Sequence, residues 1–581
     1  MKGAIFAMYG VRVHVNGKIK EFKVKPGKNI LEFLRDNSID IPTPCGGKGT
    51  CGKCRVKVKG ILKEPSEKEK ALVGSIALDK GYRLACYNQI ESDIEIFMDD
   101  LNNNANIVTS GFGEVIMGRP VITKKYIEMA KPDITDQRTD SDRVIDASGG
   151  NTELTSLKLI RELPELIREQ EYKVTIFERN VGKVSEIIGI EPGDTRNKLY
   201  GMAVDIGTTT IAAYLYDLNN GKKLDVYSTL NPQKKFGADV LSRIDFTKNS
   251  PESQNKMHKE IIDCINLIVK VFSENNNIET GDIYTAVFVG NTTMLHFLMN
   301  ISAVNIGMSP FIPVTTDLYG IKSAELDINI NKNGLIVIFP SVSAYIGADT
   351  IAAVLSTGMY EKDEISLLVD IGTNGEIVLG NKEWMYSCST AAGPAFEGAN
   401  IRNGVGGISG AIDRVYFQDK LSYTTIGNKK AVGICGSGIV DVIAGMLEKG
   451  IIDETGRIID IDEYPNPADN CTGNYASDYK SRLTESDGLN SFILASGKDS
   501  NSGNEIAITQ KDVRELQNAK AAIAAGIKTL LKHADISVDK ISKVYLAGGF
   551  GNYINIESAI KIGLIPSELK KEKIYGTCSC C

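Results

Sequence analysis

Three cysteines lie close together in the stretch PCGGKGTCGKCRVKV at residues 44–58, with the spacing Cys45-x5-Cys51-x2-Cys54. A fourth cysteine, Cys86, follows in YRLACYNQI. Four thiolates from one loop and one distant segment could hold a zinc ion or an iron–sulfur cluster, and pairs of them could form a disulfide. A structural zinc site usually uses two short cysteine pairs, whereas Cys86 stands alone. The residue pattern therefore favours an iron–sulfur cluster.

The spacing also indicates which cluster these cysteines hold. Three cysteines in one loop and a distant fourth are typical of [2Fe–2S] sites with the pattern C-x4-C-x2-C, and this loop is one residue longer. The loop also contains four glycines, Gly46, Gly47, Gly49 and Gly52. Glycines let a loop wrap a cluster and turn backbone N–H groups toward its sulfurs. We predict a [2Fe–2S] cluster on the four cysteines, with zinc and a disulfide as the alternatives.

A second kind of chemistry is indicated by a motif that occurs twice. The stretch LYGMAVDIGTTTIAAYLYDL (199–218) places Asp205 at the end of an apolar strand, before a Gly–Thr–Thr–Thr turn and a second strand. The stretch ISLLVDIGTNGEIVLGN (365–381) repeats this pattern with Asp370. A carboxylate beside such a turn suits Mg²⁺-bound phosphate, because glycine allows close approach and hydroxyl and N–H groups donate to phosphate oxygens. Two copies make a chance resemblance improbable.

Glycine-rich turns also follow two later segments. The stretch KVYLAGGFGNYI (543–554) reads as a strand that runs into Gly548 and Gly549, after an Ala-rich helix at 513–534. The stretch GICGSGIVDVIAGML (433–447) is a glycine turn that opens a helix. It could lie near phosphates, or it could be a tight helix start in the core. Both interpretations stay open.

Simple patterns predict the elements that must position these residues. Alternating apolar and polar residues at 11–24 predict a β-hairpin, and the apolar spacing at 29–37 predicts a short amphipathic helix. Residues 99–113 lose periodicity and predict a linker. Residues 157–170 predict a helix broken at Pro164, followed by a strand at 172–178.

Length and composition restrict the classes of protein. A chain of 581 residues predicts three or four domains, and 42% hydrophobic with 24% charged residues is ordinary for a soluble protein. A net charge of −7 gives no basic surface for nucleic acid. The sequence shows neither an apolar run of membrane-spanning length nor a signal peptide. Eleven cysteines, four of them assigned to a cluster, indicate a reducing cytoplasm.

The stretch from about residue 10 to about residue 100 resembles the β-grasp ferredoxins. The two Asp–Gly–Thr hairpins, together with the Gly548 turn, resemble the actin/hexokinase/Hsp70 ATPase superfamily. The combination resembles the reductive activators of corrinoid-dependent methyltransferase systems. Four further stretches carry that resemblance: NPQKKFGADVLSRI, VGNTTMLHFLM, SAYIGADTIAAVL and STAAGPAFEGANI. It implies an ATP-hydrolysing reductase that returns the Co(II) corrinoid of a partner protein to Co(I), with one electron from the cluster.

The resemblance also implies an α+β and α/β multidomain architecture. We expect a β-grasp [2Fe–2S] ferredoxin at 1–98, a linker at 99–125, a middle domain at 126–199 and a two-lobed ribonuclease-H-like ATPase domain at 200–581. The cofactors would be a [2Fe–2S] cluster, ATP and Mg²⁺. The partners would be a corrinoid protein and an upstream low-potential electron donor, and a homodimer stays open.

The resemblance assigns roles to individual residues. Asp205 and Asp370 would hold Mg²⁺ or orient the attacking water. Two further groups of residues would contact the nucleotide. The phosphates would lie against Gly207, Thr208, Thr209, Gly372, Thr373 and Asn374. The adenosine would lie beside Gly548 and Gly549. Asp349 could lie near the same cleft or act as a plain helix cap.

Three alternatives are kept. A small-molecule kinase leaves the ferredoxin unexplained. A simple electron carrier would use its C-terminal lobe only to bind a partner. An ATP-driven reductase of another low-potential acceptor is the third, although the dehydratase activators of that kind have no β-grasp domain. The ending KIYGTCSCC differs from the family pattern. A truncated end of the ATPase domain is expected, with a metal-binding cysteine tail as the lesser alternative.

Overall fold

The computed structural model describes residues 8–15, 18–37, 39, 41, 47, 49, 52, 54–98, 121–181, 184–237, 239–465, 477–486, 488–551, 553–569 and 574–576. Cys45, Cys51 and the cysteines at the C-terminal end lie outside these residues. The expected linker lies outside them up to residue 120.

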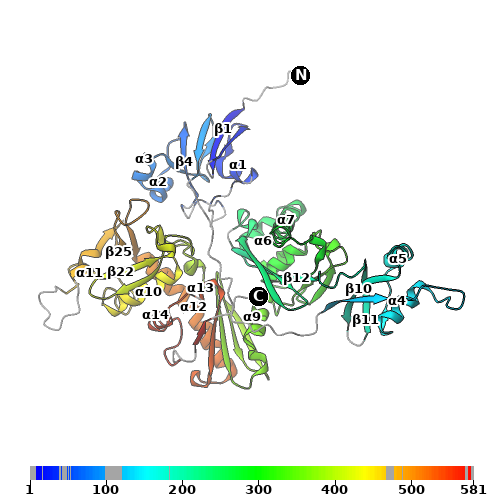
Figure 1. The fold of residues 1–581 in the computed structure, drawn as a ribbon. Helices are drawn as coiled ribbons and strands as arrows, with labels where there is room; N and C mark the ends of the chain where they lie inside the picture. The colour runs from blue at the N-terminus through cyan, green and yellow to red at the C-terminus, as the bar shows by residue number, and fades with distance from the viewer. Residues whose placement is uncertain are drawn as a thin grey trace.

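The N-terminal unit is a five-stranded sheet, and helices α1 (Ile30–Asp36), α2 (Glu67–Val73) and α3 (Ser75–Asp79) pack against it. The strand order is β2-β1-β7-β4-β5, from Lys18–Val24, Tyr9–Val15, Ile94–Phe97, Arg55–Gly60 and Tyr82–Leu84. Helix α1 buries four apolar side chains in the same core as β1. Asn29 caps α1, because its side-chain oxygen accepts the N–H of Leu31 at 2.9 Å. The hairpin and helix predicted here are confirmed, and the fold is β-grasp (Figure 1).

A four-stranded sheet with two helices follows. Its order is β8-β10-β11-β9, from Ile122–Glu128, Lys173–Val181, Val184–Pro192 and Thr152–Glu153, and its helices are α4 (Asp140–Ser148) and α5 (Leu157–Glu169). The predicted break at Pro164 is wrong, because α5 runs through it. Leu159, Leu163 and Ile167 bury one face of α5, and this packing outweighs the hydrogen bond that proline removes.

The chain then forms two lobes, each built on one sheet with its own core. The first sheet has the order β14-β13-β12-β15-β17-β16, from Lys222–Leu230, Thr210–Asp217, Tyr200–Ile206, Ile283–Gly290, Leu335–Ile338 and Tyr319–Lys322. The second has the order β20-β19-β18-β27-β28, from Met385–Thr390, Gly375–Gly380, Ser366–Ile371, Lys543–Ala547 and Ile574–Gly576.

The two sheets share one topology. In each, three antiparallel strands run in chain order from the interior of the sheet out to its edge, and the first and innermost of them pairs in parallel with a later strand. Along the chain, a long helix lies between the three antiparallel strands and the later parallel strand. This helix is α7 (Pro251–Asn276) in the first lobe and α12 (Gln510–Ala534) in the second (Figure 1). This repeat is the two-lobed ribonuclease-H-like arrangement that the sequence predicts.

The second lobe carries a large insertion between β20 and α12, at residues 391–509. It holds two three-stranded sheets, β22-β21-β23 and β24-β25-β26. Their strands are Leu421–Thr425, Ala411–Phe417, Gly433–Ile434, Leu483–Ser486, Leu489–Ala495 and Ile506–Thr509. Helix α10 (Gly436–Glu448) lies among them.

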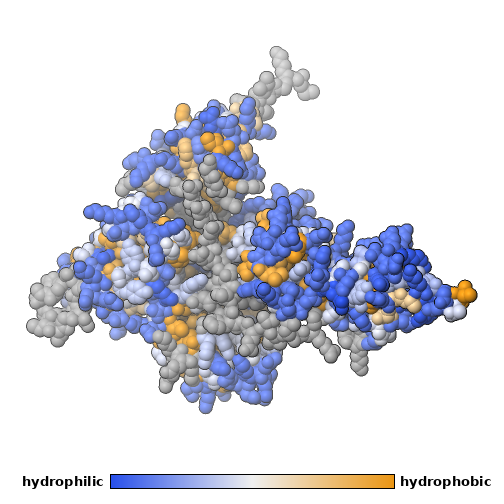
Figure 2. Space-filling model, viewed as in Figure 1, coloured by the Kyte–Doolittle hydropathy of each residue, from blue (hydrophilic) through white to orange (hydrophobic). Residues whose placement is uncertain are grey.

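The outer surface gives no sign of a membrane span. Within the part of the chain that the structure describes, every helix is too short or too polar to cross a bilayer. On the face shown in Figure 2 most residues are hydrophilic, and the apolar ones occupy separate areas.

Candidate functional site

The first Asp–Gly–Thr hairpin connects β12 to β13. Asp205 is the last residue but one of β12, and it pairs with Ala212 on β13 and with Val289 on the parallel strand β15. Its Oδ1 atom is buried and has no hydrogen-bond partner among the residues that the structure describes. An unpaired buried carboxylate oxygen is costly, so this atom is suited to a cation or a donor that arrives with a ligand.

Side chains from three other segments hold this hairpin. Asn231 Nδ2 donates to the carbonyl of Gly207 at 2.8 Å, and Asn291 Nδ2 donates to Thr208 Oγ1 at 3.0 Å. The fully buried guanidinium of Arg243 donates to the carbonyls of Thr208 and Gly237. These side chains come from stretches that carried the family resemblance, but the sequence alone did not assign them a role.

The second hairpin repeats the first at the corresponding place. Asp370 is the last residue but one of β18, and it pairs with Ala547 on the parallel strand β27. In each lobe a glycine with positive φ stands at the end of the parallel strand: Gly290, at +152°, is the last residue of β15, and Gly548, at +87°, directly follows β27. A Cβ atom would lie 2.6 Å from the carbonyl oxygen of Ile206 in the first case and 2.7 Å from that of Ile371 in the second. Both positions therefore require glycine.

The two hairpins bring buried carboxylates together from both lobes. Asp205, Asp349, Asp370 and Glu376 all have raised pKa values, and burial is the largest cause for each. The neighbouring charge of Asp349 contributes to the rise at the other three, and the pKa of Asp370 reaches about 7. Asp349 lies in the first turn of α9 (Ala348–Thr357), and the N-cap residue of that helix is Gly347 rather than Asp349. Because the charge of Asp349 raises the pKa of the other three carboxyl groups, Asp349 belongs to this cluster.

Glu397 connects the hairpins directly. Thr209 Oγ1 of the first hairpin donates to Glu397 Oε2 at 3.1 Å, and Thr373 Oγ1 of the second donates to Glu397 Oε1 at 2.7 Å. Glu397 lies in the short helix η6 (Pro394–Glu397), at the start of the insertion. Glu397 and Glu376 were not predicted as site residues from the sequence, although Glu397 stands in the stretch STAAGPAFEGANI.

The other predicted nucleotide residues lie around this cluster. Gly372 N–H donates to the carbonyl of Asn374 at 2.9 Å and closes the second turn. Gly548 packs against Asp370, since a Cβ there would lie 2.6 Å from Asp370 Oδ1. Gly549 is exposed, with open space where a side chain would begin. The donors, the glycines and the unpaired oxygen of Asp205 fit a magnesium-bound phosphate chain.

The glycine turn at 433–447 is part of the core. Residues Gly436–Met446 of α10 are buried. Ser437 Oγ donates to the carbonyl of Asp413 at 2.9 Å, and a Cβ at Gly438 would lie 2.4 Å from the carbonyl oxygen of Ile412. The structure favours the tight helix start over a phosphate contact.

Two of the predicted cluster cysteines are described, and they lie side by side. The sulfurs of Cys54 and Cys86 are 3.2 Å apart, farther than the about 2.0 Å of a disulfide bond. Gly47, Gly49 and Gly52 of the loop all have positive φ, between +64° and +95°. At Gly49 a Cβ atom would lie 2.7 Å from the Tyr87 ring. Adjacent sulfurs beside a tightly wound glycine loop fit a [2Fe–2S] cluster.

A buried glutamate fixes the segment that carries Cys86. Glu69 is 2% exposed and accepts hydrogen bonds from Arg83, from the N–H of Leu84 at 2.9 Å and from Asn88 at 2.8 Å. Burial raises the pKa of Glu69, but the hydrogen bonds outweigh it and hold the pKa below its usual value. Leu84 and Asn88 flank Cys86, so the ionised glutamate positions its loop.

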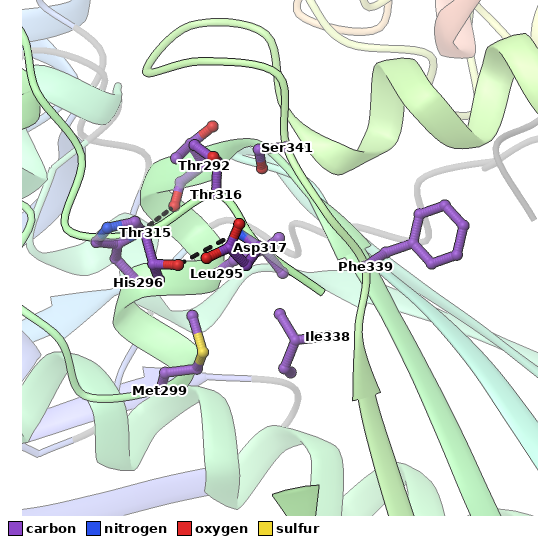
Figure 3. A pocket seen from close by; sticks show the side chains of 10 residues that line it. All are labelled: Thr292, Leu295, His296, Met299, Thr315, Thr316, Asp317, Ile338, Phe339 and Ser341. Atoms are coloured by element: carbon purple, nitrogen blue, oxygen red, sulfur yellow. Dashed lines mark hydrogen bonds between the residues drawn. The ribbon is translucent and has the colours of Figure 1, made fainter. Parts of the chain in front are cut away.

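A small cavity in the first lobe contains a histidine but has little room. The cavity has a volume of about 10 Å³, barely enough for one water, and it lies beside His296 (Figure 3). His296 is 1% exposed, and its Nε2 accepts the N–H of Val314 at 3.1 Å. Burial lowers the pKa of His296, so the ring is a neutral core group.

Comparison with known proteins finds matches along most of the sequence. Family models match four consecutive stretches, and these are the 2Fe-2S iron-sulfur cluster binding domain at 13–90, the RACo linker region at 113–197, the RACo middle region at 200–362 and the C-terminal domain of RACo, the ASKHA domain, at 364–580. The corrinoid activation enzyme RamQ of Eubacterium limosum is 32% identical over 557 residues, which cover 94% of this chain and 88% of that protein.

Two further matches agree with these. The [Co(II) methylated amine-specific corrinoid protein] reductase of Methanosarcina barkeri is 25% identical over 419 residues, or 66% of this chain and 68% of that protein. A solved structure titled "Reductive activator for corrinoid,iron-sulfur protein" is 33% identical with a TM-score of 0.69, and the match covers 98% of this chain and 91% of that one.

Proposed function

The chain belongs to the RACo family of corrinoid activation enzymes, and from that premise we propose how its residues divide the work of returning a Co(II) corrinoid to Co(I). The N-terminal domain is a [2Fe–2S] ferredoxin domain and the C-terminal domain is an ASKHA ATPase domain. The activity of the family is ATP-dependent reductive activation of corrinoid proteins. The observation that carries our assignment is the meeting of Asp205, Asp349 and Asp370 from two lobes of equal topology.

The ATPase cleft would hold MgATP between the hairpins. Asp205 and Asp370 would bind Mg²⁺ or orient the attacking water, and Mg²⁺ would neutralise charge on the phosphates. Two groups of residues would bind the nucleotide. The turns would donate to its phosphates through Gly207, Thr208, Thr209, Gly372, Thr373 and Asn374. Gly548 and Gly549 would lie beside the adenosine, where Gly549 leaves open space.

The ferredoxin domain would hold its cluster on Cys45, Cys51, Cys54 and Cys86. When bound, the cluster supplies single electrons at a reduction potential of about −400 mV. A corrinoid Co(II)/Co(I) couple lies lower, and a gap of about 100–200 mV corresponds to a few kcal/mol for one electron. That amount is within the free energy of ATP hydrolysis. The protein would apply it by binding the corrinoid partner more tightly in one nucleotide state than in another.

The division of the chain and its surroundings are also proposed. The ferredoxin would occupy 1–98, the linker 99–125, the middle domain 126–199 and the ATPase 200–581, although strand β8 already begins at Ile122. The partners would be a corrinoid protein of a methyltransferase system and an upstream low-potential electron donor. A cytoplasmic location would keep the cluster thiolates reduced.

The test is anaerobic reduction of a candidate corrinoid protein, followed by loss of its Co(II) absorbance with and without MgATP. The wild-type protein should reduce the corrinoid only with MgATP. Cys86→Ser should abolish reduction and keep ATP hydrolysis, since the cysteine lies in a separate domain. Cys264→Ser is the matched control, because Cys264 packs in the first-lobe core away from the cluster.

Two results would contradict the proposal. Zinc in place of about two irons in the anaerobically purified protein would remove the electron source. ATP consumption that leaves Co(II) unchanged, with phosphate transferred to a small molecule, would favour the kinase alternative.

A further inference from the structure

Among the described residues, Glu397 is the side chain that accepts hydrogen bonds from both Thr209 of the first hairpin and Thr373 of the second. It lies in the second lobe. Ala395 and Phe396, just before it, are buried in the second-lobe core. Gly398, just after it, has a positive φ of +78°, and a Cβ there would lie 2.4 Å from the carbonyl oxygen of Val405. The backbone on both sides is therefore fixed. The bond from Thr209 is then a contact between lobes, while the bond from Thr373 is a contact within one.

The chemistry of these two bonds sets up a competition. A threonine hydroxyl has one proton, so it can donate to only one strong acceptor at a time. In this structure both protons are directed to the carboxylate of Glu397. The same two hydroxyls belong to the turns that suit phosphate. A phosphate oxygen and the Glu397 carboxylate are both anionic acceptors, so they cannot share these donors and they repel each other.

The position of the bridge explains why such a competition would couple the lobes. Thr209 follows Asp205 by four residues and Thr373 follows Asp370 by three, so each hydroxyl lies on the turn next to a cluster carboxylate. While Glu397 accepts from both, the first hairpin is tied to the insertion of the second lobe. When phosphate takes the hydroxyls, that tie is replaced by bonds to the nucleotide.

We propose that Glu397 is a positioning residue that joins the two hairpins through Thr209 and Thr373 and yields both hydroxyls to the nucleotide phosphates. The inference rests on the proposed function, because it needs a nucleotide in this cleft. Glu397 then stabilises the protein without nucleotide and opposes nucleotide binding. It sets the lobe arrangement from which the nucleotide must start.

The test uses the full-length protein with Glu397→Gln and with Glu397→Ala. Glutamine keeps one acceptor oxygen and alanine keeps none, so the bridge is weakened and then removed. We expect the Kd for a magnesium-bound, non-hydrolysable ATP analogue, measured by calorimetry, to fall about five- to tenfold, the size of one or two hydrogen bonds. The thermal midpoint should fall without the analogue and match the wild type when the analogue is saturating.

Three further variants make the test specific. Glu383→Gln is the matched control, since Glu383 is an exposed glutamate of the same lobe, and it should change neither quantity. Thr209→Val and Thr373→Val remove donors that phosphate also needs, so each should weaken binding of the analogue. Glu397→Gln added to the double valine variant should lower the Kd less than it does in the wild-type protein, because the bridge is already absent and only the charge repulsion is removed.

Each other outcome overturns the inference in its own way. A thermal midpoint lowered equally with and without the analogue would make Glu397 a structural residue only. A lower turnover number with unchanged Kd and unchanged midpoint would make it a catalytic residue. If the wild-type protein does not bind the analogue at all, the proposed function fails together with this inference, and that result is separate from the other two.

Discussion

The two lobes present the same hairpin on sheets of the same topology, but they hold it by different means. In the first lobe Asn231, Arg243 and Asn291 bind the turn from three separate segments. In the second lobe the turn contacts Glu397 through Thr373, and glycine packing at Gly548 supports its strand. Both hairpins contact Glu397, but the three donors from its own lobe hold the first hairpin as well. Equal topology therefore does not imply equal side-chain support.

The largest expected effect tests whether the two hairpins share the chemistry equally. Asp205→Asn and Asp370→Asn should each slow ATP hydrolysis by about a hundredfold or more, because each removes a carboxylate from the cation and water site. Phosphate release measures this. Asp363→Asn is the control, an exposed residue close to the start of β18. Full ATPase activity in Asp205→Asn or in Asp370→Asn would exclude the hairpin of that residue from the site.

The bracing of the first lobe can be broken at its most buried side chain. Arg243→Met should leave the carbonyls of Thr208 and Gly237 without their donor, at a cost of about 3 kcal/mol. Hydrogen exchange of the β12 and β13 amides should then become about a hundredfold faster, while β18 and β19 keep their protection. Arg196→Met, which removes an exposed ion pair with Asp194 and a contact with the Tyr126 ring, both outside the two lobes, should change neither. Equal loss of protection in both lobes would contradict the comparison.

The third test uses a position where the first lobe has a side chain and the second lobe has a glycine. Gly549 occupies the place that Asn291 occupies after the corresponding strand, and a Cβ there meets open space. Gly549→Ala should leave the fold unchanged and weaken ATP binding about tenfold, because the methyl group enters the adenosine side of the cleft. Gly281→Ala at the opposite end of β15 is the control. Unchanged affinity would move the adenosine elsewhere.

The pH dependence has the smallest expected effect. The pKa of Asp370 is raised to about 7, so between about pH 4 and pH 7 the folded protein binds more protons than the unfolded chain. This carboxyl group therefore lowers stability as the pH rises toward 7. Binding of a magnesium nucleotide needs the ionised form, so it should release up to about one proton near pH 6.5. Calorimetry in two buffers of different ionisation enthalpy measures this release, and Asp370→Asn should reduce it.

Much of the fold was predictable because the signals are local. Strand alternation gave the hairpin of β1 and β2, and the repeated Asp–Gly–Thr pattern gave both lobes, since a turn type depends mainly on neighbouring residues. The helix break at Pro164 was predicted wrongly for the same reason. Its local signal favours a break, but the buried face of α5 keeps the helix intact.

The sequence by itself determined which residue types are present for chemistry: four cysteines in a cluster pattern, and two carboxylates at strand ends beside glycine and threonine. Only the tertiary structure decided what faces them. Glu397 lies 24 residues from Thr373 and 188 from Thr209, and Arg243 lies 35 from Thr208. No periodicity spans such separations, because these contacts form only when separately folded segments pack together. The same packing buries the carboxylates and raises their pKa values, so the electrostatics of the cleft belong to the fold.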